Sequence, residues 1–421
     1  MTSRALAAGG AVVSILIGAF AAPPGPAAAT TLTLDEALRL TRESNRHVAA
    51  SRIGARAAAE RAPDAGRRPN PEISASAENF GGARGSDLLE TTVAITQAFE
   101  LGGDRAARSG AAAADAEAAR LETGRVSLEQ EALTSERFLD AWTLQQKAAL
   151  LREAVAQARE AVAAADERHR AGAAPAFERV RAETYLATRE MERRRAEAAL
   201  AVGVRRLAVQ WNGAADEIDS LVLAEPDSVP SAEPAALLAR LASHPERVRA
   251  EAEIRSSEWR ARTARAARVP DLSIAAGVRR LAEPGVTAFT LEVCAPLPLW
   301  SGGRGTAAAA ESEREAAGAT ARAVEAELAE RALAAHDDLR AAWEAYRSVR
   351  DGIVPGAEEA LRMMRGGYLA GRLGYLEILD GQRSVLEANV LLVETHADVW
   401  RARTNLERLT GGTLASEGER R

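Results

Sequence analysis

Two segments of the chain repeat one unusual pattern, at an offset of 199 residues (270 minus 71). Each opens with proline, alternates between apolar and polar residues, and closes with Gly-Gly and an arginine. The first, Arg67–Arg105, reads RRPNPEISASAENFGG…ETTVAITQAFELGGDR, with a Gly-rich loop at Gly81–Gly85. One side of its second run holds Val93, Ile95, Phe99 and Leu101, and the other holds Thr92, Ala94, Thr96, Ala98 and Glu100. A period of two bordered by Gly and Pro predicts a β-hairpin.

The second segment, Arg268–Arg304, predicts a second hairpin of the same kind. Its shared apolar face consists of Leu291, Val293, Ala295, Leu297 and Leu299. The offset of 199 also relates Gly172 to Gly371. A repeat of this length indicates that half of the protein is duplicated, rather than a short solenoid unit.

Strands of about 9–11 residues with one apolar face suit a tilted crossing of a bilayer. The apolar face would meet lipid and the polar face would line a lumen. Four such strands cannot close a barrel, and open strand edges in lipid leave backbone groups without hydrogen bonds. We therefore expect several copies to share one barrel, and three copies with twelve strands make the smallest sensible closure.

The rest of the chain has the pattern of long helices. It is 47% hydrophobic but only 4% aromatic, which favours closely packed, alanine-rich helices. Helices are expected over residues 31–61, 105–170, 177–211, 234–268 and 305–349, and after 374. Thr33 should cap the first helix, with Glu36 completing a capping box, and Pro355 should kink the chain after 349. A seam spaced by four and three residues runs along Leu328, Ala332, Ala335, Leu339, Ala342, Tyr346 and Val349.

These features predict a mainly α fold with a small β part. Duplicated long helical hairpins would form a trimeric α-helical barrel, and four transmembrane strands per chain would complete a twelve-stranded barrel. The predicted units are a signal peptide (1–29), a first repeat (30–225), a second repeat (226–412) and a flexible tail (413–421). The signal peptide has Arg4, the apolar run Ala11–Ala22 and small residues at Ala27–Ala29. A membrane anchor is the alternative, but this run is shorter than the roughly 20 residues that a spanning helix needs.

Other functional classes find little support in the composition. The net charge of −6 and the interleaving of Arg with acidic residues argue against nucleic-acid binding. One cysteine, Cys294, excludes a disulfide framework. The histidines are scattered, so no metal site and no cofactor are expected; they are His47, His169, His244, His336 and His396. No nucleophile motif points to an enzyme.

Three motifs resemble the TolC-like outer membrane efflux proteins, and most closely their CzcC branch. They are LTLDEALRLTRESN at Leu32–Asn45, PNPEISASAENFGG at Pro69–Gly82 and ETTVAITQAFELGGDR at Glu90–Arg105. The resemblance implies a homotrimer in the outer membrane, with its helical part in the periplasm. It also implies two partners, a periplasmic adaptor (membrane fusion protein) and an inner-membrane pump of the RND type. The implied cargo is divalent heavy-metal cations.

The resemblance also implies candidate site residues. Tyr368, Glu377 and Asp380 match the periplasmic gate of the family, whereas an arginine that latches the gate in some relatives is replaced by Leu373. Glu377 and Asp380 lie three residues apart on one helix, so a trimer would gather six carboxylates around a narrow opening. The alternative interpretation is two solvated charges near a helix start. Turn residues that match the adaptor-docking tips are Gly172, Pro175, Gly371 and Gly374; these residues can also be simple turn formers.

Two other interpretations remain open. The same fold can export organic drugs or serve type I protein secretion. A periplasmic adaptor also carries a coiled-coil hairpin and a signal peptide, but it would need a lipoyl-like β-domain between the two helices, and the sequence has no such segment.

Overall fold

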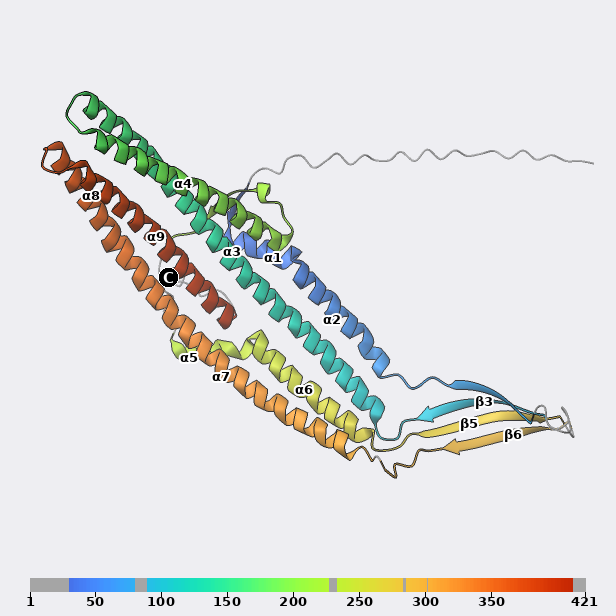
Figure 1. Ribbon diagram of the computed structural model, residues 1–421. Coiled ribbons are helices and arrows are strands. Elements are labelled where there is room, and N and C mark those ends of the chain that lie inside the picture. Colours follow the sequence, from blue (N-terminus) through green and yellow to red (C-terminus); the bar gives the residue numbers. More distant parts are fainter. Residues whose placement is uncertain (1–29, 80–88, 227–232, 283–284, 301, 412–421) are drawn as a thin grey trace, which may run out of the picture.

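The computed structural model describes residues 30–79, 89–226, 233–282, 285–300 and 302–411. They form a long rod of helices with a small β-sheet at one end (Figure 1). At the other end lie the connecting turns of two helical hairpins. The predicted signal peptide, the loop Gly81–Gly85 and the predicted tail lie outside the described residues. The domain boundaries proposed from the sequence therefore remain a prediction.

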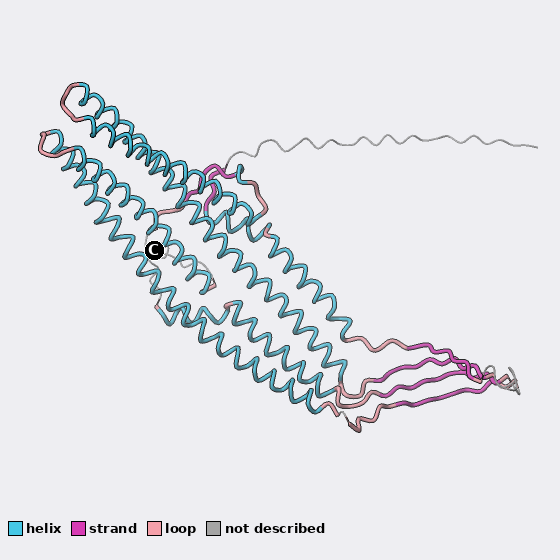
Figure 2. Tube along the Cα trace, viewed as in Figure 1, coloured by secondary structure: helices cyan, strands magenta, loops and turns pink. Residues whose placement is uncertain are grey.

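Both proline-led segments are β-hairpins, as predicted, and they join in one antiparallel sheet. Its strands are β2 (Glu72–Glu78), β3 (Glu90–Phe99), β5 (Leu272–Leu281) and β6 (Thr287–Cys294), in the order β2-β3-β5-β6. The contact between β3 and β5 unites segments far apart in the sequence, which Figure 2 shows side by side. The strands β2 and β6 form the two edges of the sheet.

The register of the sheet separates apolar from polar side chains. One row across the strands is Ile73, Ile95, Ala276 and Leu291, and the next row on that face contains Val93, Val278 and Phe289. These apolar side chains are exposed, Phe289 to 90%. The opposite face carries rows such as Ser74, Ala94, Gly277 and Thr290. A sheet with one exposed apolar face and one polar face is what a lipid-facing barrel wall requires.

The predicted length of the last strand is wrong. The expected alternation runs to Leu299, but β6 ends at Cys294. Pro296 and Pro298 follow, and proline has no N–H to donate to a ladder. Leu297 and Leu299 are exposed residues beyond the sheet.

The first predicted helix is in fact two helices. The chain begins with β1 (Thr30–Thr33), followed by α1 (Leu34–Ser44) and α2 (Arg46–Ala65). Thr33 caps α1 as expected, since its Oγ1 accepts a hydrogen bond from the Glu36 N–H at 3.3 Å. Asn45 interrupts the helix because its side chain accepts from the His47 and Val48 N–H groups and starts a new one.

The first long hairpin matches the prediction closely. It consists of α3 (Asp104–Arg170) and α4 (Ala176–Ala208), followed by the 3-10 helices η2 (Val209–Trp211) and η3 (Ala215–Glu217). The next segment contains β4 (Ile218–Val222), a strand that the sequence analysis did not predict, and β4 pairs in parallel with β1. This short sheet ties the start of the described chain to the connection between the halves.

The second half repeats the plan of the first. It contains α5 (Pro234–Arg240), η4 (Leu241–Ser243), α6 (Pro245–Ala266) and α7 (Arg304–Ser348). A π-helical turn, η5 (Val349–Ile353), precedes α8 (Val354–Leu369), and α9 (Tyr375–Thr410) completes the second hairpin. The irregularity before Pro355 agrees with the predicted interruption.

Two buried clusters hold the helices together. The first joins Phe138 and Trp142 of α3 to Leu207 of α4 and Leu221 of β4. The second contains the predicted seam of α7, where Leu328, Ala332, Ala335, Leu339 and Tyr346 are buried. Each fully buried leucine contributes roughly 1.5–3 kcal/mol to this packing. Within the described residues, no helix contains an apolar stretch long enough to cross a bilayer.

Candidate functional site

The two helical hairpins end in turns of one type at the end of the rod opposite the sheet (Figure 1). Gly172 follows α3 and Gly371 follows α8, with φ values of +69° and +72°. In the first turn the Ala173 N–H donates to the Arg168 carbonyl, and in the second the Arg372 N–H donates to the Gly367 carbonyl, both at 2.9 Å. Glycine is required here because other residues rarely adopt this left-handed conformation.

The other two predicted turn residues each precede a helix. Pro175 and Gly374 are the extended residues directly before α4 and α9. A Cβ atom added to Gly374 would lie 3.0 Å from the Glu377 Oε2 atom, so the Glu377 carboxylate folds back over the start of its helix. The role of these four residues as turn formers is confirmed, and their role in docking remains a prediction.

Tyr368 connects the two hairpins. Arg168, in the last turn of α3, donates a hydrogen bond to the Tyr368 hydroxyl of α8. The Arg168 guanidinium carbon also lies 4.8 Å from the centre of the Tyr368 ring. The ring of Tyr375 is 6.3 Å away, centroid to centroid. Tyr368 can be predicted from the sequence, but Arg168 cannot, because no local pattern shows that the ends of α3 and α8 meet.

A small buried cluster supports this contact. Ala165 of α3, Ala182 of α4, and Tyr375 and Ile378 of α9 pack together. The Tyr375 hydroxyl is buried and has no hydrogen-bond partner among the described residues. Burial, with a smaller contribution from nearby Tyr185, raises the pKa of Tyr375 to about 12. The hydroxyl therefore stays protonated at any physiological pH.

Glu377 and Asp380 are exposed and line one hollow of about 570 Å³ between α4, α8 and α9. The same hollow contains three arginines, Arg181 and Arg189 of α4 and Arg383 of α9. The Asp380 Oδ1 atom accepts a hydrogen bond from Arg383 at 2.5 Å. The surroundings of the predicted gate carboxylates are thus mixed in charge, whereas the sequence indicated an acidic site.

The arginines of this hollow differ in their partners. Arg189 forms an ion pair with Glu192 at 2.8 Å, and its guanidinium carbon lies 5.0 Å from the Tyr185 ring centre. Arg181 has no ion-pair partner within the part of the chain that the structure describes. Arg181 on α4 and Glu377 on α9, neither of which has an ion-pair partner among the described residues, therefore line the same hollow.

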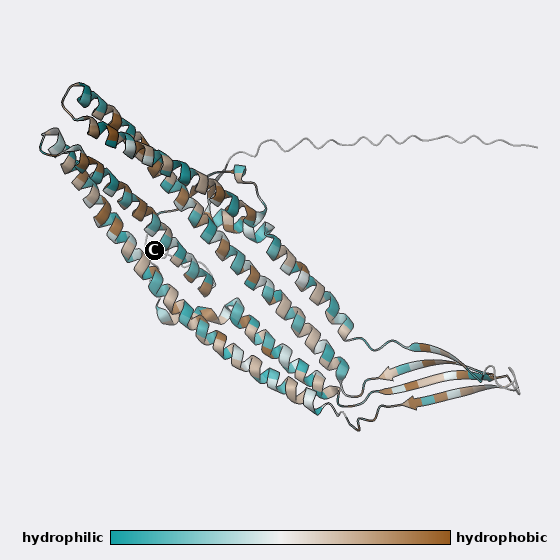
Figure 3. Ribbon diagram, in the orientation of Figure 1, coloured by the Kyte–Doolittle hydropathy of each residue, from teal (hydrophilic) through white to brown (hydrophobic). Residues whose placement is uncertain are grey.

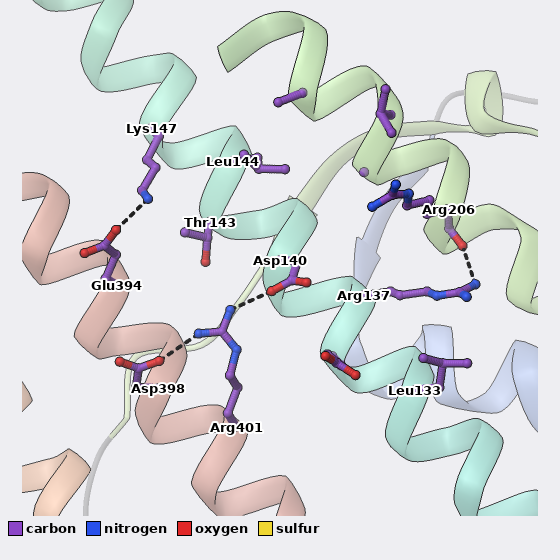
Figure 4. Close-up of a pocket in the computed structure, with 14 residues that line it drawn as sticks. Leu133, Arg137, Asp140, Thr143, Leu144, Lys147, Arg206, Glu394, Asp398 and Arg401 are labelled. Atoms are coloured by element: carbon purple, nitrogen blue, oxygen red, sulfur yellow. Dashed lines mark hydrogen bonds and ion pairs between the residues drawn. The ribbon is translucent and has the colours of Figure 1, made fainter. Parts of the chain in front are cut away.

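A second hollow, of about 860 Å³, lies midway along the rod between α3, α4 and α9 (Figure 4). Ion pairs cross it from α3 to α9. Lys147 contacts Glu394 at 2.6 Å, and Arg401 contacts both Asp140 and Asp398 at 2.7 Å. Lys147 and Asp140 of α3 thus pair with Glu394 and Arg401 of α9 and hold the two hairpins together, whereas Asp398 pairs with Arg401 within α9.

The described residues contain no group of three or more His, Cys, Asp or Glu side chains arranged to hold a metal ion. His396 is buried among aromatic rings, and His244 caps α6 through its Nδ1 atom, which accepts from the Glu246 N–H.

Both the sequence and the architecture are similar to those of known proteins. The family model described as outer membrane efflux protein matches residues 239–412. The chain is 26% identical, over 385 residues, to the cobalt-zinc-cadmium resistance protein CzcC of Cupriavidus metallidurans, and the match covers 91% of each protein.

Two solved structures share the fold over nearly the whole chain. The outer membrane protein VceC of Vibrio cholerae superposes with a TM-score of 0.75 at 18% identity, covering 91% of this chain and 97% of that one. CusC, whose structures concern folding and transmembrane channel formation, superposes with a TM-score of 0.78 at 15% identity, covering 90% and 92%.

Proposed function

Because this chain belongs to the family of outer membrane efflux proteins, we propose that three copies form the exit duct of a tripartite efflux system in the outer membrane. The observation that carries this proposal is the single four-stranded sheet with one apolar and one polar face. Its two edge strands need partners in a bilayer, and identical neighbours supply them. Twelve strands in three copies close the barrel.

The long helices extend the duct into the periplasm. The α3–α4 and α8–α9 hairpins end in neighbouring turns, which suits a narrow entrance that faces a periplasmic adaptor. Gly172, Pro175, Gly371 and Gly374 would form the adaptor-docking tips, and an RND-type pump in the inner membrane would supply the energy. The duct itself is passive.

Glu377 and Asp380 would line the entrance, with Tyr368 holding the second hairpin against the first through Arg168. A trimer would bring six carboxylates to this opening, among guanidinium groups that limit their net field. Rings of charged side chains select ions by sign in other channels. The entrance would therefore admit cations with a moderate preference.

Divalent heavy-metal cations are the proposed cargo, on the strength of the similarity to CzcC. Weak, scattered contacts agree with transport, because a cation that must leave the duct cannot be held tightly.

Deletion of the gene in its host tests the proposed cargo, and fractionation of the host membranes tests the proposed location. The deletion strain should lose growth under zinc, cadmium or cobalt, regain it with the wild-type gene, and keep its tolerance of organic drugs. Sensitivity to drugs alone would contradict the metal cargo. Recovery of the protein as a periplasmic monomer, rather than as a trimer in outer membrane fractions, would contradict the duct.

A further inference from the structure

Four connections between strands and helices lie side by side at one end of the rod (Figure 1). We call the exposed side chains of these connections, together with those at the adjoining ends of the strands and helices, the junction belt. Its apolar members are Phe99, Leu101, Leu297, Leu299 and Trp300. Its basic members, one at each connection, are Arg68, Arg105, Arg268 and Arg304.

Phe99 is the last residue of β3, and the other apolar members follow the strands β3 and β6 in sequence, on the way to the helices. Trp300 is 95% exposed, and Leu297 and Leu299 are 74% and 70% exposed. Figure 3 shows hydrophobic colour along the strands, which lead into these residues. Tryptophan concentrates at the boundary between hydrocarbon and headgroups because its ring is apolar and its N–H is polar. These side chains therefore place the boundary of the bilayer at the junction belt.

The basic members lack acidic partners, unlike most arginines of the helical body. Arg68, Arg105 and Arg304 are exposed, with no ion pair to any described residue. Arg268 donates from Nε to the Gly302 carbonyl at 3.3 Å and also has no carboxylate partner among the described residues. By contrast, Arg120 and Arg362 of the helical body pair with Glu117 and Glu359 at 2.7 and 2.5 Å.

Neighbouring carboxylates do not neutralise these arginines. Asp64 is paired with Arg67 at 3.2 Å, and Glu100 is paired with Arg108. Among the described residues, Asp104 and Asp271 also lack ion pairs, as does Glu72 at the start of β2, so four unpaired arginines face three unpaired carboxylates. The belt therefore keeps a positive charge at the level where phosphate groups of lipids lie.

We propose that the junction belt binds the headgroups of anionic phospholipids in the bilayer leaflet on the helical side. Lipid chains would cover the exposed leucines and Trp300, while the arginines donate hydrogen bonds to the phosphate and the anionic headgroup. A basic side chain near an anionic surface favours binding about fivefold. The proposal rests on the proposed function, since it requires the sheet to span a membrane.

Spin-labelled lipids test this binding in the full chain. The protein is reconstituted in phosphatidylcholine bilayers that contain a trace of labelled phosphatidylglycerol or labelled phosphatidylcholine. Electron paramagnetic resonance then reports the fraction of each label that the protein immobilises. We expect wild-type protein to prefer phosphatidylglycerol about fivefold, and 0.5 M NaCl to reduce this preference.

The variant R68Q/R105Q/R268Q/R304Q should immobilise both labels equally. The control variant R39Q/R120Q/R194Q/R362Q removes the same charge from ion pairs on the helical body and should keep the wild-type preference. If the first variant does not assemble, R105Q/R304Q should lose about half of the preference on a logarithmic scale.

Equal immobilisation of both lipids by the wild-type protein, or an unchanged preference in R68Q/R105Q/R268Q/R304Q, would overturn the junction belt and leave the duct intact. A wild-type protein that immobilises neither label does not span the bilayer, and that result would overturn the belt and the proposed function together.

Discussion

The imidazole of His396 on α9 donates its Nε2 hydrogen to the carbonyl of Ala224, 2.9 Å away, in the connection between the two halves of the chain. The Trp400 indole donates to the same carbonyl at 2.9 Å. The His396 ring packs against Trp142 of α3 and Tyr346 of α7, with centroid distances of 4.7 and 5.6 Å. One buried histidine thus joins the connection to helices from both halves.

Acid should destabilise the fold around His396, because the charged imidazole would be buried. Burial lowers the pKa of His396, and the Ala224 carbonyl and the Glu225 carboxylate, 3.9 Å from Nδ1, oppose that shift only in part. The Tyr346 hydroxyl, which faces Arg350, also donates to Glu225 at 2.5 Å. Because the unfolded chain takes up a proton near the ordinary pKa of about 6.5, stability should fall as the pH drops below that value.

The thermal midpoint in detergent at pH 7.5 and pH 5 measures this effect. His396→Gln should reduce the loss of stability between the two pH values, whereas exposed His47→Gln should leave the loss unchanged. Part of the loss should remain in His396→Gln, since burial also lowers the pKa of His244. An identical loss in both variants would show that His396 does not control the acid response.

Neutral residues at the entrance should reduce cation selectivity. In the double variant Glu377→Gln with Asp380→Asn, six negative charges disappear from the trimer while Arg181, Arg189 and Arg383 remain. The reversal potential under a salt gradient in planar bilayers should shift towards anion preference. The control Glu183→Gln removes a carboxylate that pairs with Arg179 on the outer side of α4. An unchanged reversal potential in the double variant would exclude these residues from the gate.

Removing one oxygen atom tests the contact between the hairpins. Tyr368→Phe keeps the ring beneath Arg168 and loses the hydroxyl that accepts its hydrogen bond. A hydrogen bond to a charged group contributes about 1.5–3 kcal/mol. We therefore expect openings to become roughly tenfold more frequent in single-channel records. Equal opening frequencies in wild type and variant would show that this bond does not hold the entrance.

Two glycines of α3 should respond in opposite directions to alanine. A Cβ atom at Gly110 would lie 2.4 Å from the Trp259 ring of α6, whereas Gly124 has nothing within 4 Å. Gly110→Ala should destabilise the protein by about 1–3 kcal/mol through overpacking. Gly124→Ala should stabilise it by up to about 1 kcal/mol, because alanine favours helices. The thermal midpoints of the two variants measure this difference. Equal shifts of the midpoint in both variants would show that α6 does not pack against Gly110.

Much of the fold follows from local sequence patterns. The alternation at Val93–Phe99 and at Leu291–Val293 specifies strands directly, and the spacing of Leu328, Ala332 and Ala335 specifies a helical seam. The turns at Gly172 and Gly371 follow from a backbone conformation that glycine alone adopts easily. These elements need only neighbouring residues for their prediction.

Other features depend on partners distant in sequence. Asn45 divides the first helix by capping α2, and its side chain also donates to the Gln210 carbonyl at 2.8 Å. The pairing of β1 with β4 depends on segments about 190 residues apart. At the candidate site, the resemblance gave Tyr368, Glu377 and Asp380, but only the fold brings Arg168, Arg181 and Arg189 to them.

Inter-copy disulfide cross-linking tests most directly whether identical chains share one barrel. In a Cys294→Ser background, one cysteine replaces Ser74 on the edge strand β2, and a second is placed in turn at each position from 288 to 292 on the edge strand β6. In outer membranes, at least one register should yield covalent dimers and trimers, with no larger species. A chain that remains monomeric at every register would contradict a barrel built from three copies.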